Sequence, residues 1–262
     1  AAPGPAERAH AARVLGFRPP PAAELVVSPT ALVDFVRCPR QFFNRHVLAL
    51  PGPRGLGIGR AVDPVRMGVA THAALETLDL ACAPADRPGA VTAALARARG
   101  LSDGERAEIA RDLLAALARW ADVDREIVVL GRELPFCLPV AGTPRLFIRG
   151  RIDLVAARGA RLVVRDYKYA RPAPDGEAYR VQMEIYALAV ATAHPGRAID
   201  AEIDYLRGAG ERVEIALDFP AARERLCRVG TDLAAALAAG DASAFPKAYP
   251  GPASCRALGC AF

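Results

Sequence analysis

Two aspartates and a lysine near the middle of the chain could support metal-assisted hydrolysis. The segment Gly150–Asp153 reads GRID, and Asp166–Lys168 reads DYK. Carboxylate oxygens are ligands for hard divalent cations, and an ammonium can stabilise negative charge that grows during a reaction. Arginine supplies nearly all the positive charge of this chain, and Lys247 is the other lysine. Because an amine is compact and its pKa can be tuned, Lys168 indicates chemistry more than solubility.

The two motifs are predicted to lie on one β-hairpin. Arg149–Ala157 and Arg161–Tyr169 are both rich in β-branched and apolar residues, which favours strands. Gly159 and Ala160 between them suit a two-residue type II′ turn. The apolar content of both strands is typical of a central hairpin. The alternative is a surface hairpin with scattered charges.

That turn fixes which side chains share a face. It places Asp153 directly opposite Asp166. Side chains alternate along a strand, so Lys168 shares the face of the two aspartates and Tyr167 points away. Neighbouring carboxylates repel each other unless a cation lies between them. The register therefore predicts a cation site.

Composition sets the class of protein. The chain has 262 residues and is 52% hydrophobic, which fits one elaborated domain or two small ones. A net charge of +5 and a pI near 9.1 permit binding to a polyanion. No long apolar run predicts a membrane span, no signal segment opens the chain, and the scattered cysteines do not form a secreted framework. We therefore expect a cytoplasmic protein.

The elements that must position the hairpin follow from local patterns. Residues 1–27 are rich in Pro and Ala and are predicted to be a linker or arm, so that 28–262 form the domain, with the chain expected to be a piece of a longer protein. Helices are predicted at about 28–43, 65–80, 102–120, 178–194 and 221–239. Strands are predicted at about 126–130, 133–138, 146–157, 161–169, 201–206 and 213–217. This order predicts an α/β fold with a mixed central sheet flanked by helices.

Three further residues fall on predicted helices. His72 lies on the second helix, where an isolated histidine is more often a surface or core residue than a ligand. Gln182 and Tyr186 are four residues apart and share one helix face. An amide and a phenol there could hold a phosphate backbone or stack on a base. Spacing alone favours an ordinary amphipathic helix with Tyr186 in the core.

Cysteines near both ends of the chain could hold a metal. Cys38 lies far in sequence from Cys255 and Cys260. Thiolates brought together from both ends could bind an iron–sulfur cluster or a zinc ion, and the alternative is three buried small hydrophobic residues. A 4Fe–4S cluster takes four cysteines, so a fourth ligand would be expected beyond Phe262.

Five motifs in order resemble the PD-(D/E)XK nucleases of the RecB type, over about residues 28–262. The resemblance covers a restriction-endonuclease-like core and the entry helix of the AddB-like exonuclease branch. The matching segments are Ser28–Phe43, Gly68–Glu76, Gly150–Asp153, Asp166–Lys168 and Gln182–Tyr186.

The resemblance implies a role for each matched residue. It implies that Mg²⁺ or Mn²⁺ is bound by His72, Asp153, Asp166 and the carbonyl of Tyr167. Lys168 would orient or activate the attacking water. The residues implied to hold DNA are Gln182 and Tyr186, and those implied to bind a 4Fe–4S cluster joining the chain ends are Cys38, Cys255 and Cys260.

The resemblance implies a metal-dependent deoxyribonuclease. The expected activity is exonucleolytic, on single-stranded DNA ends, in recombination and double-strand-break repair. A helicase would be fused upstream or supplied by a partner protein. The alternatives are a non-catalytic nuclease-fold module that binds DNA within a helicase complex, and a zinc-binding module with its site at the cysteines.

Overall fold

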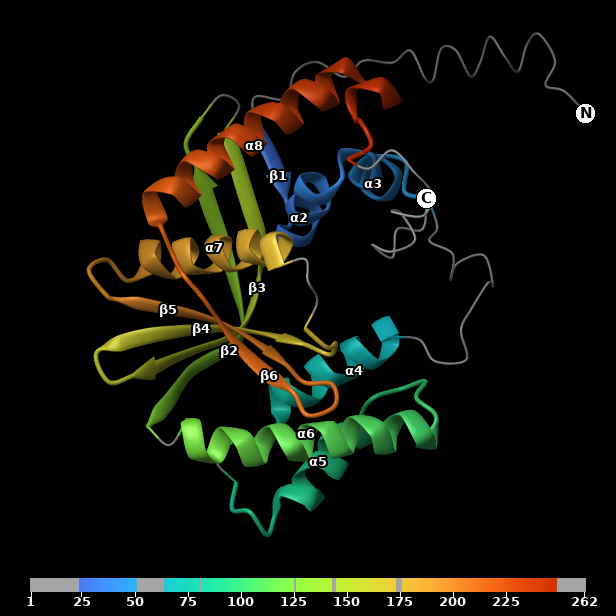
Figure 1. Ribbon diagram of the computed structural model, residues 1–262, viewed down its shortest axis with the longest axis vertical. Helices are drawn as coiled ribbons and strands as arrows, with labels where there is room; N and C mark the ends of the chain where they lie inside the picture. The colour runs from blue at the N-terminus through green and yellow to red at the C-terminus, as the bar shows by residue number, and fades with distance from the viewer. Residues whose placement is uncertain are drawn as a thin grey trace, which may run out of the picture. The chain divides into compact units, whose positions relative to one another are not determined.

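The structure is a computed structural model that describes residues 24–50, 64–80, 82–124, 126–142, 145–172 and 176–248. The chain divides into two units, which we describe separately. The hairpin unit comprises residues 59–136 and 150–218, and the terminal unit comprises residues 1–58, 137–149 and 219–262. Figure 1 labels the elements of both.

A mixed β-sheet forms the centre of the hairpin unit, as the sequence predicts. The strands are β2 (Ile127–Val140), β3 (Arg145–Arg158), β4 (Arg161–Lys168), β5 (Ile199–Tyr205) and β6 (Glu211–Ile215). β2 pairs with β3. β3 and β4 are antiparallel, β4 and β5 are parallel, and β5 and β6 are antiparallel.

The predicted hairpin register is confirmed. Leu154 lies opposite Arg165, and Arg158 lies opposite Arg161. Gly159 has a φ of +58° at the turn, a conformation that glycine adopts without steric cost. β4 is buried along almost its whole length, so the surface-hairpin alternative is wrong.

Helices cover both faces of the hairpin-unit sheet (Figure 1). α7 (Gly176–Ala193) lies against β4 and β5. On the other face, apolar side chains of β3 and β4 pack with α4 (Pro64–Thr77), α5 (Arg87–Ala96) and α6 (Asp103–Val123). The buried residues of this core include Leu113, Leu117, Trp120, Leu154, Val163 and Tyr167.

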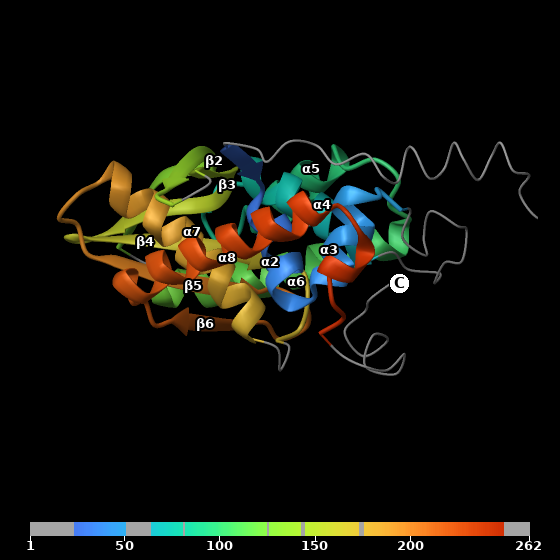
Figure 2. The same cartoon turned by 90° about the horizontal axis from the view of Figure 1, so that it is seen from above.

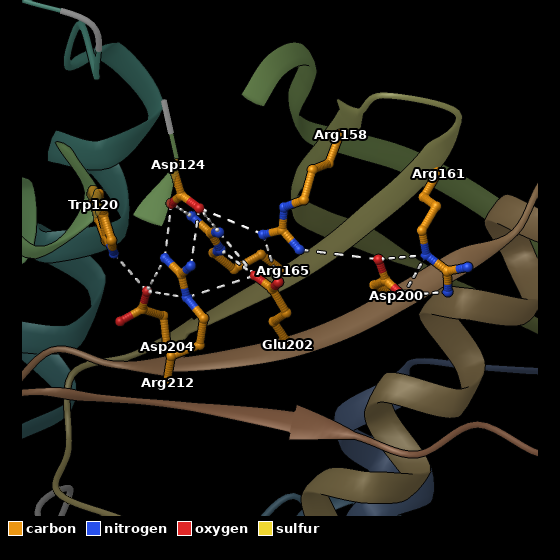
Figure 3. A network of polar contacts seen from close by, with 9 residues as sticks. All are labelled: Trp120, Asp124, Arg158, Arg161, Arg165, Asp200, Glu202, Asp204 and Arg212. Carbon is orange, nitrogen blue, oxygen red and sulfur yellow. Dashed lines mark hydrogen bonds and ion pairs between the residues drawn. The ribbon is translucent and has the colours of Figure 1, made fainter. Parts of the chain in front are cut away.

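Figure 3 shows a network of charged side chains around Arg165, whose guanidinium lies over the ring of Trp120 from α6. Arg165 is 1% exposed, and its guanidinium donates to both Asp124 and Glu202 at 2.8–3.1 Å. Burial opposes the charge of Arg165, but the carboxylates and Tyr167 outweigh it, so the pKa of Arg165 is raised. A buried guanidinium is tolerated only with such partners. The remaining inner members are Trp120, Arg158, Asp204 and Arg212.

The terminal unit begins with strand β1 (Glu24–Val27), which pairs in parallel with Arg145–Ile148 of β3. Its helices are α2 (Pro29–Arg37), α3 (Pro39–Phe42), the π-helix η1 (Phe43–Val47), α8 (Phe219–Ala239) and the 3₁₀-helix η3 (Ala242–Ala244). α2 and α3 lie side by side in both views (Figures 1 and 2). The rings of Phe35, Phe42, Phe43 and Phe245 pack together.

Several predicted boundaries are wrong. The first helix is interrupted at Cys38, because Pro39 disfavours helical backbone in the residue before it. The two strands predicted at 126–138 are one strand, β2. Glu24–Val27 form β1 within the predicted linker, and α5 forms where no helix is predicted. Within the described ranges, no helix combines the length and apolarity needed to cross a membrane.

The capping box of α6 generates a stability prediction. Ser102 accepts from the Glu105 N–H, and Glu105 accepts from the Ser102 N–H at 2.8 Å. Ser102→Ala should lower the free energy of unfolding by about 1 kcal/mol, measured by urea denaturation. Thr92→Ala, at an exposed α5 position, is the control and should change it by less than about 0.5 kcal/mol. Equal losses in the two variants would contradict this role for the capping box.

The charge network generates a second prediction with a matched control. Arg165→Met should lower the free energy of unfolding by about 3–5 kcal/mol, because it leaves buried carboxylates without a main partner. Arg161 makes a bidentate pair with Asp200 but is largely exposed (Figure 3). Arg161→Met should therefore cost less than about 1 kcal/mol. Urea denaturation of both variants measures the difference, and an Arg165→Met variant as stable as Arg161→Met would refute it.

Candidate active site

Three potential metal ligands meet in the hairpin unit. His72 comes from α4, Glu133 from β2 and Asp153 from β3, and one ligand atom of each lies within 4.8 Å of the other two. Nδ1 of His72 is 3.5 Å from Oδ2 of Asp153 and 3.9 Å from Oε1 of Glu133. Two carboxylates and an imidazole form a donor set that suits a divalent cation.

Glu133 is the member of this group that the sequence does not reveal. It has a φ of +46°, which is a strained conformation for a residue with a long side chain. A Cβ on Gly131, two residues earlier, would lie 2.7 Å from the Leu134 side chain, so the strand is tightly bent here. The gap at 131–132 between the strands predicted at 126–130 and 133–138 coincides with this bend.

The backbone of β4 orients Asp153. The N–H of Tyr167 donates to Oδ2 of Asp153 at 2.7 Å. The backbone pairing of β3 with β4 ends at Leu154 and Arg165. Beyond that point, the Asp153 carboxylate accepts the hydrogen bond from the β4 backbone. The Tyr167 side chain points away as predicted and packs on Trp120, with ring centroids 5.5 Å apart.

The buried Asp166 and the partly exposed Lys168 form an ion pair on the α7 side of β4. Nζ of Lys168 lies 2.8 Å from Oδ2 of Asp166 and donates to Oε1 of Gln182 at 3.1 Å. The Gln182 amide group donates to Oδ1 of Asp166 at 3.1 Å and to the Tyr186 hydroxyl at 2.8 Å. Four of the predicted site residues are therefore joined by direct polar contacts.

Burial shifts the pKa values of this group. Burial raises the pKa of Asp166 to about 6, although the Lys168 charge opposes the shift. Burial also opposes the charge of Lys168, but the pair with Asp166 outweighs it and raises the pKa of the lysine. Burial, followed by the charge of Asp153, raises the pKa of Glu133. Burial opposes protonation of His72, but Asp153 and Asp166 outweigh it and raise its pKa.

The donor set fits a divalent cation. Oδ2 of Asp166 is buried and receives no well-aligned hydrogen bond from the described residues, despite the ion pair with Lys168. An oxygen left in this state normally has a further partner. The mutual repulsion of the acids would also be relieved by a cation. The structure thus groups His72 and Asp153 with Glu133, and it pairs Asp166 with Lys168.

The other predicted ligands are the carbonyl of Tyr167 and three cysteines. Metal binding by the Tyr167 carbonyl remains a prediction. Cys38 is buried between α2 and α3, whereas Cys255 and Cys260 lie outside the described residues. The iron–sulfur cluster also remains a prediction.

The strain at Glu133 generates a test that separates stability from metal binding. Glu133→Gly should raise the free energy of unfolding in EDTA by about 1 kcal/mol, because glycine tolerates the positive φ and the repulsion with Asp153 is removed. Glu133→Gln removes the charge but keeps the strain, so it should gain less. Both variants should bind Mn²⁺ at least about tenfold more weakly by calorimetry. Wild-type affinity in both would exclude Glu133 as a ligand.

Comparisons with known proteins place the chain in a family. A curated relative from Desulforudis audaxviator (strain MP104C), one of the subunits of an ATP-dependent helicase/nuclease, is 35% identical over 157 residues, which cover 53% of this chain and 13% of that protein. A solved structure from Eubacterium rectale, described as a candidate exonuclease, is 10% identical with a TM-score of 0.46, and the match covers 83% of this chain and 82% of that one. A family model for the PD-(D/E)XK nuclease superfamily matches residues 26–262. The chain therefore belongs to the PD-(D/E)XK nuclease superfamily.

Proposed function

We propose that this chain is a divalent-metal-dependent deoxyribonuclease that degrades DNA from single-stranded ends. One observation carries the proposal: a group of His72, Glu133 and Asp153 with metal-ligand spacing occurs in the same unit as the Asp166–Lys168 ion pair. Membership of a nuclease superfamily supports hydrolysis of a phosphodiester bond. Mg²⁺ and Mn²⁺ are the proposed cations because carboxylate oxygens suit both.

The side chains of the site would have separate roles in holding the cation. His72, Glu133 and Asp153 would hold the cation, and Oδ2 of Asp166, which is paired with Lys168, would be a further ligand. When bound, a divalent cation supplies Lewis acidity, which withdraws charge from a phosphoryl oxygen and acidifies water. The Tyr167 N–H would keep the Asp153 carboxylate in one orientation.

Lys168 would act as a fixed positive charge. Its Nζ lies 2.8 Å from Oδ2 of Asp166 and donates to Oε1 of Gln182 at 3.1 Å, so the ammonium is held beside the proposed ligands. A protonated amine orients water and stabilises a developing oxyanion, and it does not accept the proton of the attacking water. Of the two roles that the resemblance implies for Lys168, we propose orientation of the attacking water.

Gln182 would position the catalytic pair. Both ends of its amide are already used, by Lys168 on one side and by Asp166 and Tyr186 on the other. An amide engaged in this way is more suited to fixing the carboxylate and ammonium than to holding DNA. The Tyr186 hydroxyl, which is buried, would extend the same network.

We propose the biological setting from the matched helicase/nuclease subunit and from the net charge of this chain. The matched relative belongs to a helicase/nuclease, and this chain spans 13% of its length. We infer that the nuclease works beside a helicase in recombination and double-strand-break repair. The net charge of +5 favours a polyanionic substrate. A 4Fe–4S cluster on Cys38, Cys255 and Cys260 remains part of the proposal.

The proposal is tested with end-labelled DNA. The wild-type protein should release label from linear single strands with Mg²⁺ or Mn²⁺, and EDTA should stop it. Asp166→Ala and Lys168→Ala should each lower the rate at least about 100-fold, since each removes charge stabilisation of the transition state. Lys247→Ala is the matched control, because it removes the other lysine at an exposed position, and it should cut like wild type.

Three outcomes would change the proposal. Undiminished cutting by both active-site variants would refute the assigned residues. Tight DNA binding without cleavage under any metal would favour the non-catalytic binding module. Equal cutting of circular and linear single strands would refute action from ends and leave an endonuclease.

A further inference from the structure

We propose that Tyr179 is a positioning residue for Lys168, and that the face of its aromatic ring holds the ammonium in its working orientation. This inference rests on the proposed function, because it adds a residue to the same site. The ring centroid of Tyr179 lies 5.1 Å from Nζ of Lys168. A cation at this distance over an aromatic face is attracted by the negative face of the ring.

The ammonium then has three different partners. Asp166 contacts Nζ at 2.8 Å, Gln182 accepts from it at 3.1 Å, and Tyr179 offers a π face. A lysine stem is a flexible four-carbon chain with no preferred end geometry. A third partner further limits where the charge of the ammonium can lie. Lys168 is therefore held in place, although its side chain is still 20% exposed.

The Tyr179 ring is itself held by packing. Its edge-to-face contact with Tyr205 has a centroid separation of 6.5 Å. Tyr205 is buried in β5 and lies directly beside Lys168 in the parallel pairing of β4 and β5. Tyr179 also lies three residues before Gln182 on α7, so both side chains leave the same face of the helix. Side chains from α7 therefore contact the Lys168 ammonium, and β5 supports one of them through Tyr205.

The ring, and not the hydroxyl, carries the proposed role. Tyr179→Phe keeps the aromatic face, and Tyr179→Leu keeps much of the apolar volume without it. We expect Tyr179→Phe to cut single-stranded DNA at close to the wild-type kcat, and Tyr179→Leu to lose about 3- to 30-fold in kcat with little change in KM. Mn²⁺ affinity by calorimetry should match wild type in both, because neither change touches a proposed ligand.

A double-mutant cycle separates this role from substrate stacking. In a Lys168→Ala background, Tyr179→Leu should have almost no further effect, because residues that act through each other are not additive. If Tyr179 instead stacks on a DNA base, Tyr179→Leu should raise KM in both backgrounds by the same factor, and that result would overturn the proposal. Equal kcat in wild type and Tyr179→Leu would also overturn it.

A second measurement does not depend on nuclease activity. Lys168 and Lys247 are the lysines of the chain, so protein labelled with ¹³C at the lysine ε-carbon gives two assignable NMR signals. The Lys168 signal should show an upfield ring-current shift in wild type and in Tyr179→Phe, and should lose it in Tyr179→Leu. The Lys247 signal is the internal control. A Lys168 signal that is identical in all three proteins would refute the contact, and an inactive wild-type enzyme with the shift intact would refute the proposed function alone.

Discussion

Charge buried on both faces of one strand is the constraint on which the hairpin unit depends. β4 is almost entirely buried, yet it carries Arg165 on one face and Asp166 with Lys168 on the other. An isolated charge in such a place would cost several kcal/mol. Each charge is therefore matched by partners from other elements, and these partners fix where α6, α7 and the neighbouring strands lie. The same requirement produces both the structural network and the candidate active site.

The buried charges on the two faces of β4 are matched by partners to different degrees. Arg165 donates hydrogen bonds to the carboxylates of Asp124 and Glu202, so its charge is matched by two acids on this face. On the other face Asp166 keeps one oxygen without a well-aligned donor among the described residues, and its pKa is raised to about 6. Glu133 is held with a strained backbone beside Asp153. Polar atoms without hydrogen bonds and strained backbone are typical of functional sites. Ionisable groups with shifted pKa values are typical of them as well.

Much of the candidate site follows from local patterns. A glycine in a two-residue turn predicts the register of the hairpin, and the period of two along a strand then predicts one face for Asp153, Asp166 and Lys168. The i, i+4 spacing of Gln182 and Tyr186 predicts one helix face, and the structure adds that the amide bridges both members of the ion pair. Both predictions rest on local geometry, because a tight turn and a helix repeat each involve residues only a few positions apart.

Contacts between distant segments could not be predicted in this way. The gap between two predicted strands does not reveal that Glu133 has a positive φ or that its side chain meets His72 of α4. Nothing near Tyr179 in the sequence indicates that its ring covers a lysine on β4. Arg165 and Asp124 are 41 residues apart, and their pairing appears only when α6 packs on the sheet. The sequence by itself determined the hairpin, its register and the residues able to do chemistry, because turn and strand geometry are local. Only the tertiary structure decided which of those residues lie at metal-ligand spacing, which pair with each other and which backbone is strained, because burial and long-range packing set the energy of every charge.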